Sequence, residues 1–171
     1  MLIIPGYEVT AIDPRAAFDA RVEVEAFHAL YCHTLDTGDL EHWVDFFDDE
    51  CTYIVTAREN VESGLRVGLV YAEGRGMIRD RAFSVKHTQM FAPRYMLHAV
   101  SNVLVLRADA AEIRTVSNYM LLQTLVEGPT TIHQAGRYYD TFVRSGGKLL
   151  IRERRCVYDT SLIANDLVFP V

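Results

Sequence analysis

The sequence predicts an α+β fold in which N-terminal helices cover one face of a strongly curved, mainly antiparallel sheet, so that the molecule has the shape of a cone. Two observations lead to this class. Apolar residues recur at helical spacing over the first third of the chain, and long segments rich in β-branched and aromatic residues follow later. With 171 residues, half of them hydrophobic, the chain can bury one sizeable core, so we expect a single domain over residues 1–171.

Two helices are expected before the first strand. The first begins after Asp13, which can accept the orphan amide protons, with Pro14 in its first turn, and it should end near Gly38. Asp39 can cap a shorter second helix, and the two helices should pack as a hairpin against the sheet. The apolar stripe of the second helix consists of Leu40, Trp43, Val44 and Phe47.

The sheet is predicted from five segments with high β-propensity. Residues 51–57 form the first strand, and a third helix is expected within residues 72–90. The later segments are joined by short separators, which predicts an antiparallel meander. Their strands have up to 15 residues, whereas the usual length is about 5 or 6, so the strands must coil strongly. The interior of such a cone is either a core or an active site. The four later strands are 97–106, 112–126, 131–143 and 148–160.

Composition excludes several classes of function. The net charge of -6 arises from 17 basic and 23 acidic residues spread along the chain, which argues against nucleic acid as a partner. The longest stretches without charge have 12 residues, whereas a membrane span needs about 20. Three cysteines without a C-x-x-C pair indicate neither a disulfide framework nor a zinc knuckle. We therefore expect a cytoplasmic protein with free thiols and no membrane association.

One side of the first helix carries potential metal ligands. His28, Cys32 and Asp36 are four residues apart, share a helix face and offer nitrogen, sulfur and oxygen to iron or zinc. The alternative is a helix face packed on the sheet, with Cys32 as a small hydrophobic residue. This alternative is favoured because a two-histidine, one-carboxylate iron site needs two imidazoles and a cysteine beside iron is easily oxidised.

The stretch SVKHTQMFAPRYMLHAVSN, residues 84–102, raises the question of acid/base chemistry, because it contains His87 and His98. His98 lies in a segment of period 2 with Val100, Asn102 and Leu104, so its ring should share a sheet face with apolar neighbours. Both imidazoles could project into the cone and act as bases near neutrality. The alternative is a hydrogen-bonded core histidine and a surface one.

A dehydratase or isomerase site in the cone would use Tyr31, Asp36, Tyr53, His98 and Asn118, although nothing in their spacing forces them to converge.

Charged residues interrupt several apolar stretches. Arg58 lies in ARENV, Arg79 and Arg81 in MIRDR, and Arg94 just before a predicted strand. The RERR run at 152–155 places charges on both faces of the last strand. Such residues usually form a solvated face. The alternative is a subunit interface, where arginine is enriched because its planar fork pairs with carboxylates and carbonyls.

Four segments of the chain form a combination of motifs that is more specific than any single histidine: ARENVESGL at 57–65, GMIRDRAFSVKHT at 76–88, PRYMLHAVSNVLV at 93–105 and AGRYYDTFVRSGGKLLIRERRCVYDTSLIANDLVFPV at 135–171. In the last segment, a G-R-Y-x-D-x-x-V strand, a turn and an R-R-x-V-x-D strand precede a short apolar tail. With these segments, the whole chain resembles the small, or beta, subunit of aromatic-ring-hydroxylating dioxygenases of the Rieske non-haem iron type. The REN, MIRDR and DLVFPV stretches look most like the small subunits of salicylate 5-hydroxylase and terephthalate dioxygenase.

The resemblance implies a fold similar to nuclear transport factor 2 (NTF2-like, or cystatin-like). It also implies a β3 trimer that supports three catalytic α subunits in an α3β3 hexamer. The Rieske 2Fe-2S cluster and the mononuclear iron then lie on the α subunit. This sequence has neither the C-x-H nor the C-x-x-H pair that a Rieske cluster needs. We therefore expect no cofactor, metal or catalytic residue on this chain.

The residues expected to face neighbouring subunits are Arg58, Arg79, Arg81 and Arg94. Two alternatives remain open. One is a free-standing dehydratase or isomerase of the same fold with His98 and Asp36 as acid/base groups, and the other is a free-standing module that binds a small molecule in the cone.

Overall fold

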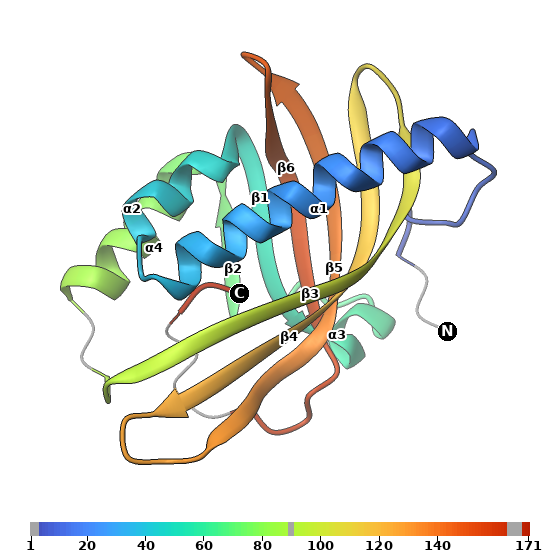
Figure 1. Cartoon of the computed structure of the whole chain (residues 1–171). Coiled ribbons are helices and arrows are strands. Elements are labelled where there is room, and N and C mark those ends of the chain that lie inside the picture. The colour runs from blue at the N-terminus through green and yellow to red at the C-terminus, as the bar shows by residue number, and fades with distance from the viewer. Residues whose placement is uncertain (1–3, 89–90, 164–168) are drawn as a thin grey trace.

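The fold is a single curved sheet with helices packed on its concave side (Figure 1). The structure is a computed structural model that describes residues 4–88, 91–163 and 169–171. In these residues six strands are hydrogen-bonded in the order β2-β1-β6-β5-β4-β3. The elements are α1 (Pro14–Asp36), α2 (Leu40–Trp43), the 3-10 turn η1 (Val44–Phe46), β1 (Phe47–Ala57), α3 (Arg58–Glu62), β2 (Val70–Glu73), α4 (Gly74–His87), β3 (Arg94–Ala108), β4 (Glu112–Leu125), β5 (Thr130–Ser145) and β6 (Lys148–Tyr158).

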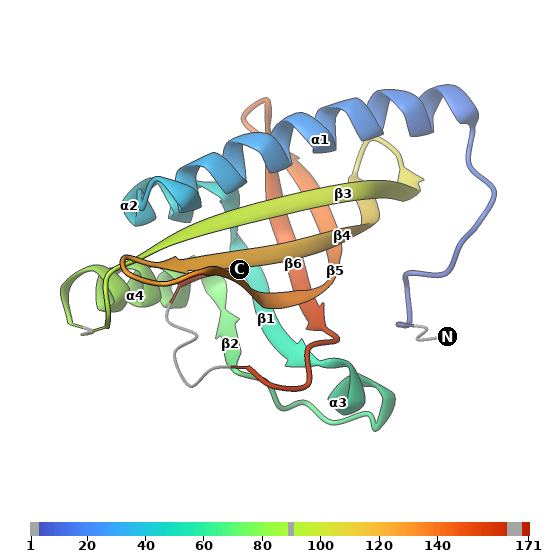
Figure 2. The same ribbon diagram turned by 60° about the horizontal axis from the view of Figure 1, so that its bottom comes forward.

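The strand order confirms the predicted antiparallel meander from β3 to β6. The first and last long strands lie side by side inside the sheet, next to the edge strand β2, and β1 and β6 pair in parallel. The long strands bend around the helical layer, and β3 and β4 sweep beneath α1 (Figure 2). The expected α+β cone with a mainly antiparallel sheet is therefore confirmed.

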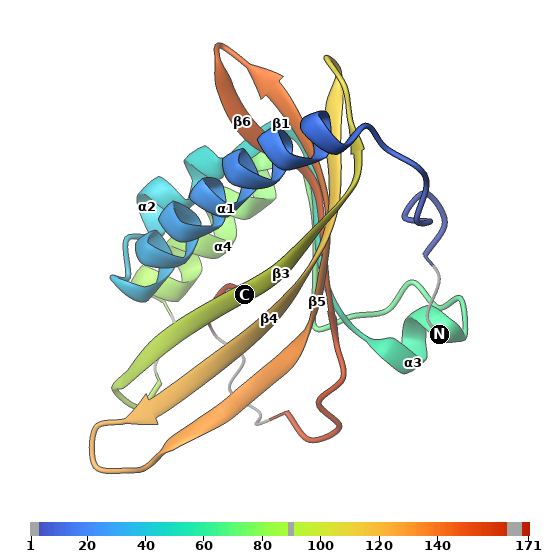
Figure 3. The same cartoon turned by 45° about the vertical axis from the view of Figure 1, so that its right-hand side comes forward.

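The helices α1, α2 and α4 lie together on the concave side, while α3 lies on the opposite side (Figure 3). The predicted caps are present. The Asp13 carboxylate accepts a hydrogen bond from the Ala16 amide at 2.9 Å, and Gly38 ends the turn after α1 with a φ of 75°, a left-handed conformation that glycine adopts without a steric cost. The core between the layers is rich in aromatic side chains, which include Tyr31, Trp43, Phe47, Tyr53, Tyr138 and Phe142.

Three local predictions were incomplete or wrong. The strand β2 and the short helix α3 were not expected, because four and five residues are too few for a period to be visible in the sequence. Phe47 was assigned to the second helix, but it is the first residue of β1 and its backbone pairs with Ile151. Its spacing from Trp43 and Val44 fits a helix, but it is fully buried at the start of β1, where its ring packs against Tyr31, Trp43 and Tyr53.

The strand β3 also changes face along its length. Asn102 has a φ of 55°, and the register with β4 shifts between Ser101 and Leu104. A bulge of this kind adds a residue to one strand and so reverses the alternation of its side chains. His98 therefore faces the interior, whereas Leu104, expected on the same face, is 47% exposed.

Candidate functional site

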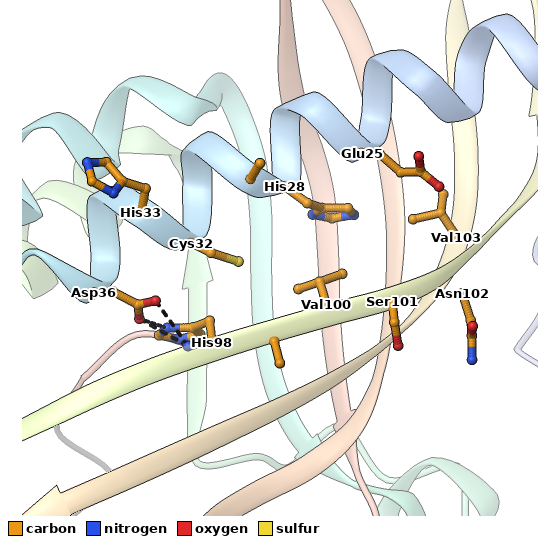
Figure 4. Close-up of a pocket in the computed structure, with 12 residues that line it drawn as sticks. Glu25, His28, Cys32, His33, Asp36, His98, Val100, Ser101, Asn102 and Val103 are labelled. Atoms are coloured by element: carbon orange, nitrogen blue, oxygen red, sulfur yellow. Dashed lines mark hydrogen bonds and ion pairs between the residues drawn. The ribbon is translucent and has the colours of Figure 1, made fainter.

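The interior of the cone contains a histidine–carboxylate pair. Asp36 is the last residue of α1, and its Oδ1 atom lies 2.7 Å from Nδ1 of His98 on β3 (Figure 4). The backbone amide of His98 also donates to Oδ1 of Asp36 at 3.0 Å. The pair therefore fixes the C-terminal end of α1 to the first half of β3. Its composition is that of a general acid/base dyad, in which a carboxylate orients an imidazole.

The second nitrogen of this imidazole is already in use. His98 Nε2 lies 3.2 Å from the main-chain oxygen of Pro170. The Asp36 carboxylate and the Pro170 carbonyl thus occupy both ring nitrogens of His98. In this conformation no ring nitrogen of His98 is available to accept a proton from a substrate.

Two tyrosines complete this part of the interior. The hydroxyls of Tyr31 on α1 and Tyr53 on β1 donate to the main-chain oxygen of Val171 at 3.0 and 3.1 Å. The Val171 amide in turn donates to the Tyr53 hydroxyl at 2.9 Å. Burial raises the pKa of both phenols, so they act as neutral donors. Their ligand is thus the chain's own C-terminal residue.

The structure brings together four of the five residues considered for a dehydratase site: Tyr31, Asp36, Tyr53 and His98. Asn118 was the fifth, and it lies on the other face of the sheet. Its neighbours Ser117 and Tyr119 belong to the alternate residues of β4 that point inward and are buried. Because side chains alternate along a strand, Asn118 points away from the interior.

A second buried polar cluster was missed by the sequence analysis. Arg154 on β6 and Asp140 on β5 are both fully buried, and their side chains form two parallel hydrogen bonds of 2.8 Å. The guanidinium lies between the rings of Tyr31 and Tyr138, at 4.3 Å from each centroid. Its Nη2 atom is also 3.3 Å from Nδ1 of His28. Desolvation and the adjacent guanidinium lower the pKa of His28, which is therefore neutral.

The expectation of a solvated face for the RERR run is therefore wrong for Arg154. A signal was available in the sequence, because Asp140 and Arg154 are directly paired across the β5–β6 hairpin. Opposite charges at directly paired positions of neighbouring strands indicate an ion pair, and Asp140 and Arg154 both lie at buried positions of their strands. Arg152, two residues earlier, does lie at the surface and pairs with Asp48 and Glu50.

A cavity of about 500 Å³ separates α1 from the middle of β3 (Figure 4). His28, Cys32 and Asp36 all line it, which confirms that they share a helix face. They do not form a metal centre, because His28 interacts with Arg154 and Asp36 with His98. Burial raises the pKa of the Cys32 thiol to about 11, so the thiolate that a metal would require is disfavoured. Within residues 4–88, 91–163 and 169–171, no three His, Cys, Asp or Glu residues are grouped to hold a metal ion.

The four arginines predicted to face other subunits come from three separate elements. Arg58 begins α3 and forms an ion pair of 2.5 Å with Asp159. Arg94 begins β3 and donates to the side-chain oxygen of Gln123 at 2.9 Å. Arg79 and Arg81 lie on α4, the first exposed and the second half-buried. Nothing in the single chain tests the role expected for them.

His87 is the last residue of α4, as expected from the sequence. Its side chain is exposed and packs against the ring of Phe83, with 4.6 Å between the ring centroids. Of the two histidines in the stretch 84–102, His98 is therefore the one that enters the interior.

None of the helices described is both long and apolar enough to cross a bilayer.

The curved sheet and its helical layer define the NTF2-like class of α+β proteins. Within that class, residues 32–165 match the family described as ring hydroxylating beta subunit. The small subunit of anthranilate 1,2-dioxygenase from Burkholderia cepacia is 35% identical over 149 residues, which cover 87% of this chain and 92% of that protein. The chain therefore belongs to the family of β subunits of aromatic-ring-hydroxylating dioxygenases.

Two further similarities agree with this family. Subunit beta 2 of the terminal oxygenase component of terephthalate 1,2-dioxygenase from Comamonas is 28% identical over 150 residues, covering 88% of this chain and 97% of that one. A solved structure from Novosphingobium aromaticivorans, the β subunit of a protein assigned as an aromatic-ring-hydroxylating dioxygenase, superposes with a TM-score of 0.82. It is 32% identical and covers 90% of this chain and 98% of its own. The resemblance found in the sequence is thus confirmed, and it favours a subunit of an oxidoreductase over a free-standing dehydratase.

Proposed function

We propose that this chain is the structural, non-catalytic β subunit of the terminal oxygenase component of a multicomponent aromatic-ring-hydroxylating oxygenase. It supports a catalytic α subunit, which carries the Rieske 2Fe-2S cluster and the mononuclear iron, in an α3β3 hexamer built on a β3 trimer. The match of residues 32–165 to the β-subunit family carries the proposal. The substrate class is an aromatic carboxylate, because anthranilate and terephthalate, named for two relatives, are both aromatic carboxylates.

The interior of the cone supports a non-catalytic role. The His98 imidazole has an acceptor at each ring nitrogen, and the Tyr31 and Tyr53 hydroxyls are engaged by Val171. A general base must have a lone pair directed at the proton that it removes. The groups that a dehydratase would use are therefore committed to holding the chain together. The cytoplasm is part of the same proposal, supported by three cysteines that form no disulfide.

Arg58, Arg79, Arg81 and Arg94 belong to this proposal as residues that face neighbouring subunits. Arg79 offers the sharpest test. It is exposed on α4 one helical turn before Phe83, whose side chain is 60% exposed. A planar cation beside an exposed aromatic ring is a composition enriched in protein interfaces.

The proposal is tested by purifying the affinity-tagged chain from its native host. We expect it to co-purify with a coloured partner that shows the visible absorption of a Rieske centre. Alone, the chain should be trimeric, iron-free and inactive. Stoichiometric iron in the isolated chain, or a turnover that the His98→Ala variant loses, would instead support the free-standing enzyme.

The interface residues are tested in the same purification. Arg79→Glu should reduce the amount of co-purified α subunit or dissociate the trimer, because it reverses a charge at the interface. Arg15→Glu is the matched control, since Arg15 is also an exposed helical arginine, on α1, and pairs with Asp19. Equal recovery of partner with both variants would remove Arg79 from the interface.

A further inference from the structure

The end of the chain occupies the hollow between the helical layer and the curved sheet. All three ribbon views place the C-terminus inside this hollow, between α4 and the long strands β3 and β4 (Figures 1, 2 and 3). Each of the last three residues has a defined partner. The Phe169 ring packs edge-on against Phe91 at 5.0 Å. The main-chain oxygen of Pro170 accepts a hydrogen bond from His98 Nε2, and Val171 is fully buried in the core.

The side chains that hold this segment come from three distant elements. Tyr31 on α1, Tyr53 on β1 and His98 on β3 direct three donor groups at two main-chain oxygens, while Tyr53 also accepts from an amide. The three residues are at most 7% exposed. Buried polar groups are nearly always hydrogen-bonded, and a buried group without a partner is strongly destabilising. Without residues 169–171 these three donors would lose the partners that the structure shows.

We infer that the interior of the cone is a ligand-binding site for a short, apolar, peptide-like molecule, and that residues 169–171 occupy it as a tethered ligand. The ligand must present one oxygen to the two phenol hydroxyls, a second oxygen to the imidazole, and an N–H to Tyr53. Between these groups it must carry a side chain of about the size of valine. The inference stands apart from the proposed subunit function, because it concerns only contacts within this chain.

The tether explains why the site is filled. A segment attached by a short linker has an effective concentration in the millimolar range, so a weak ligand suffices for occupancy. A free ligand of the same chemistry competes only when the tethered one is removed or weakened. The site should therefore be closed in the complete chain and open in a chain that lacks residues 169–171.

The test uses the chain without residues 169–171 and the synthetic tripeptide N-acetyl-Phe-Pro-Val. Deletion should lower Tm by on the order of 10 °C, because it removes a buried side chain and several hydrogen bonds. The tripeptide at about 1 mM, at the lower end of the millimolar effective concentration of a short tether, should recover several degrees. It should leave Tm of the complete chain unchanged. N-acetyl-Phe-Pro-Gly, which lacks the buried side chain, is the control and should recover little.

A second variant guards against a deletion that fails to fold. Val171→Asp in the complete chain places a charge at a fully buried position and should expel the segment without shortening the chain. The tripeptide should then raise Tm of this variant as it does for the deletion. The inference would be overturned if either variant had the same Tm as the complete chain. It would also be overturned if a variant were folded and destabilised but gained no more in Tm from N-acetyl-Phe-Pro-Val than from N-acetyl-Phe-Pro-Gly.

Discussion

The buried pair of Arg154 and Asp140 makes the strongest prediction about stability. The perturbation is a double-mutant cycle of Asp140→Ala, Arg154→Met and the two together. Each single substitution leaves one charged group without its partner in the core, whereas the double substitution leaves none. Arg152→Met is the matched control, because Arg152 lies on the same strand and its side chain is 41% exposed.

The structure sets the expected magnitudes. Both side chains are fully buried and share two hydrogen bonds of 2.8 Å, so removing one partner should cost about 3–5 kcal/mol of the free energy of unfolding. In Asp140→Ala the guanidinium keeps its contacts with the rings of Tyr31 and Tyr138, which retain about 2 kcal/mol of cation–π attraction. The double variant should lose less than the sum of the single variants, with a coupling energy of about 2–3 kcal/mol. The exposed control should lose at most about 1 kcal/mol.

The assay is equilibrium unfolding in urea followed by tryptophan fluorescence. Trp43 is fully buried, and the sequence has one tryptophan, so the signal reports the core directly. Protein concentration must be held constant, because self-association would add to the apparent stability. Equal losses for Arg154→Met and Arg152→Met, or additive effects in the cycle, would refute the claim that this pair is an energetically coupled unit of the core.

Three further predictions follow from burial. Because His28 is neutral in the fold and the unfolded imidazole has a pKa of 6.5, the unfolded state alone gains a proton below pH 6.5. The free energy of unfolding should therefore fall below pH 6.5 by up to about 1.4 kcal/mol per pH unit. Urea unfolding at pH 7 and pH 5.5 measures this fall, and the His28→Gln variant should not show it. Burial raises the pKa of Cys32 and Cys51 to about 11, so Ellman's reagent at pH 8 should label these thiols only on unfolding; fast labelling of native protein would contradict this. Gly136→Ala places its Cβ against the Val157 carbonyl and 2.6 Å from Tyr158 Cα, and should cost about 3 kcal/mol. Gly76→Ala, in an open helical position, should instead stabilise by about 0.5 kcal/mol, and equal Tm values would refute the distinction.

The parts of the fold that could be predicted from the sequence are those with a long period or a strong cap. The helix α1 has 23 residues, an aspartate cap and a proline in its first turn, so many residues agree on one assignment. The elements that escaped were β2 with four residues and α3 with five. The parallel pairing of β1 with β6 was also missed, because it joins segments about 100 residues apart and depends on how the whole sheet closes.

The candidate site, like the fold, could be predicted from the sequence only in part. His28, Cys32 and Asp36 could be placed on one face because a helix has a fixed geometry. Their partners could not, since His98 and Arg154 reach them from strands 62 and 126 residues away in the sequence. The bulge at Asn102 further obscured which residues of β3 face inward, because a left-handed φ leaves no clear trace in a period-2 pattern.

These contacts also bear on how one fold supports both enzymes and scaffolds. The helix α1 is fixed to the sheet twice, through His28 to Arg154 and through Asp36 to His98, at points eight residues apart, or about 12 Å along the helix axis. Two polar anchors at that spacing restrict both sliding and rotation of the helix, because each hydrogen bond tolerates only small changes of distance and angle. A subunit that serves by presenting a fixed outer surface benefits from this restraint. An enzyme of the same shape would need the His98 nitrogen and the tyrosine hydroxyls to be free for its substrate. The residues that suggest catalysis in the sequence are thus among those that fix α1 to the sheet.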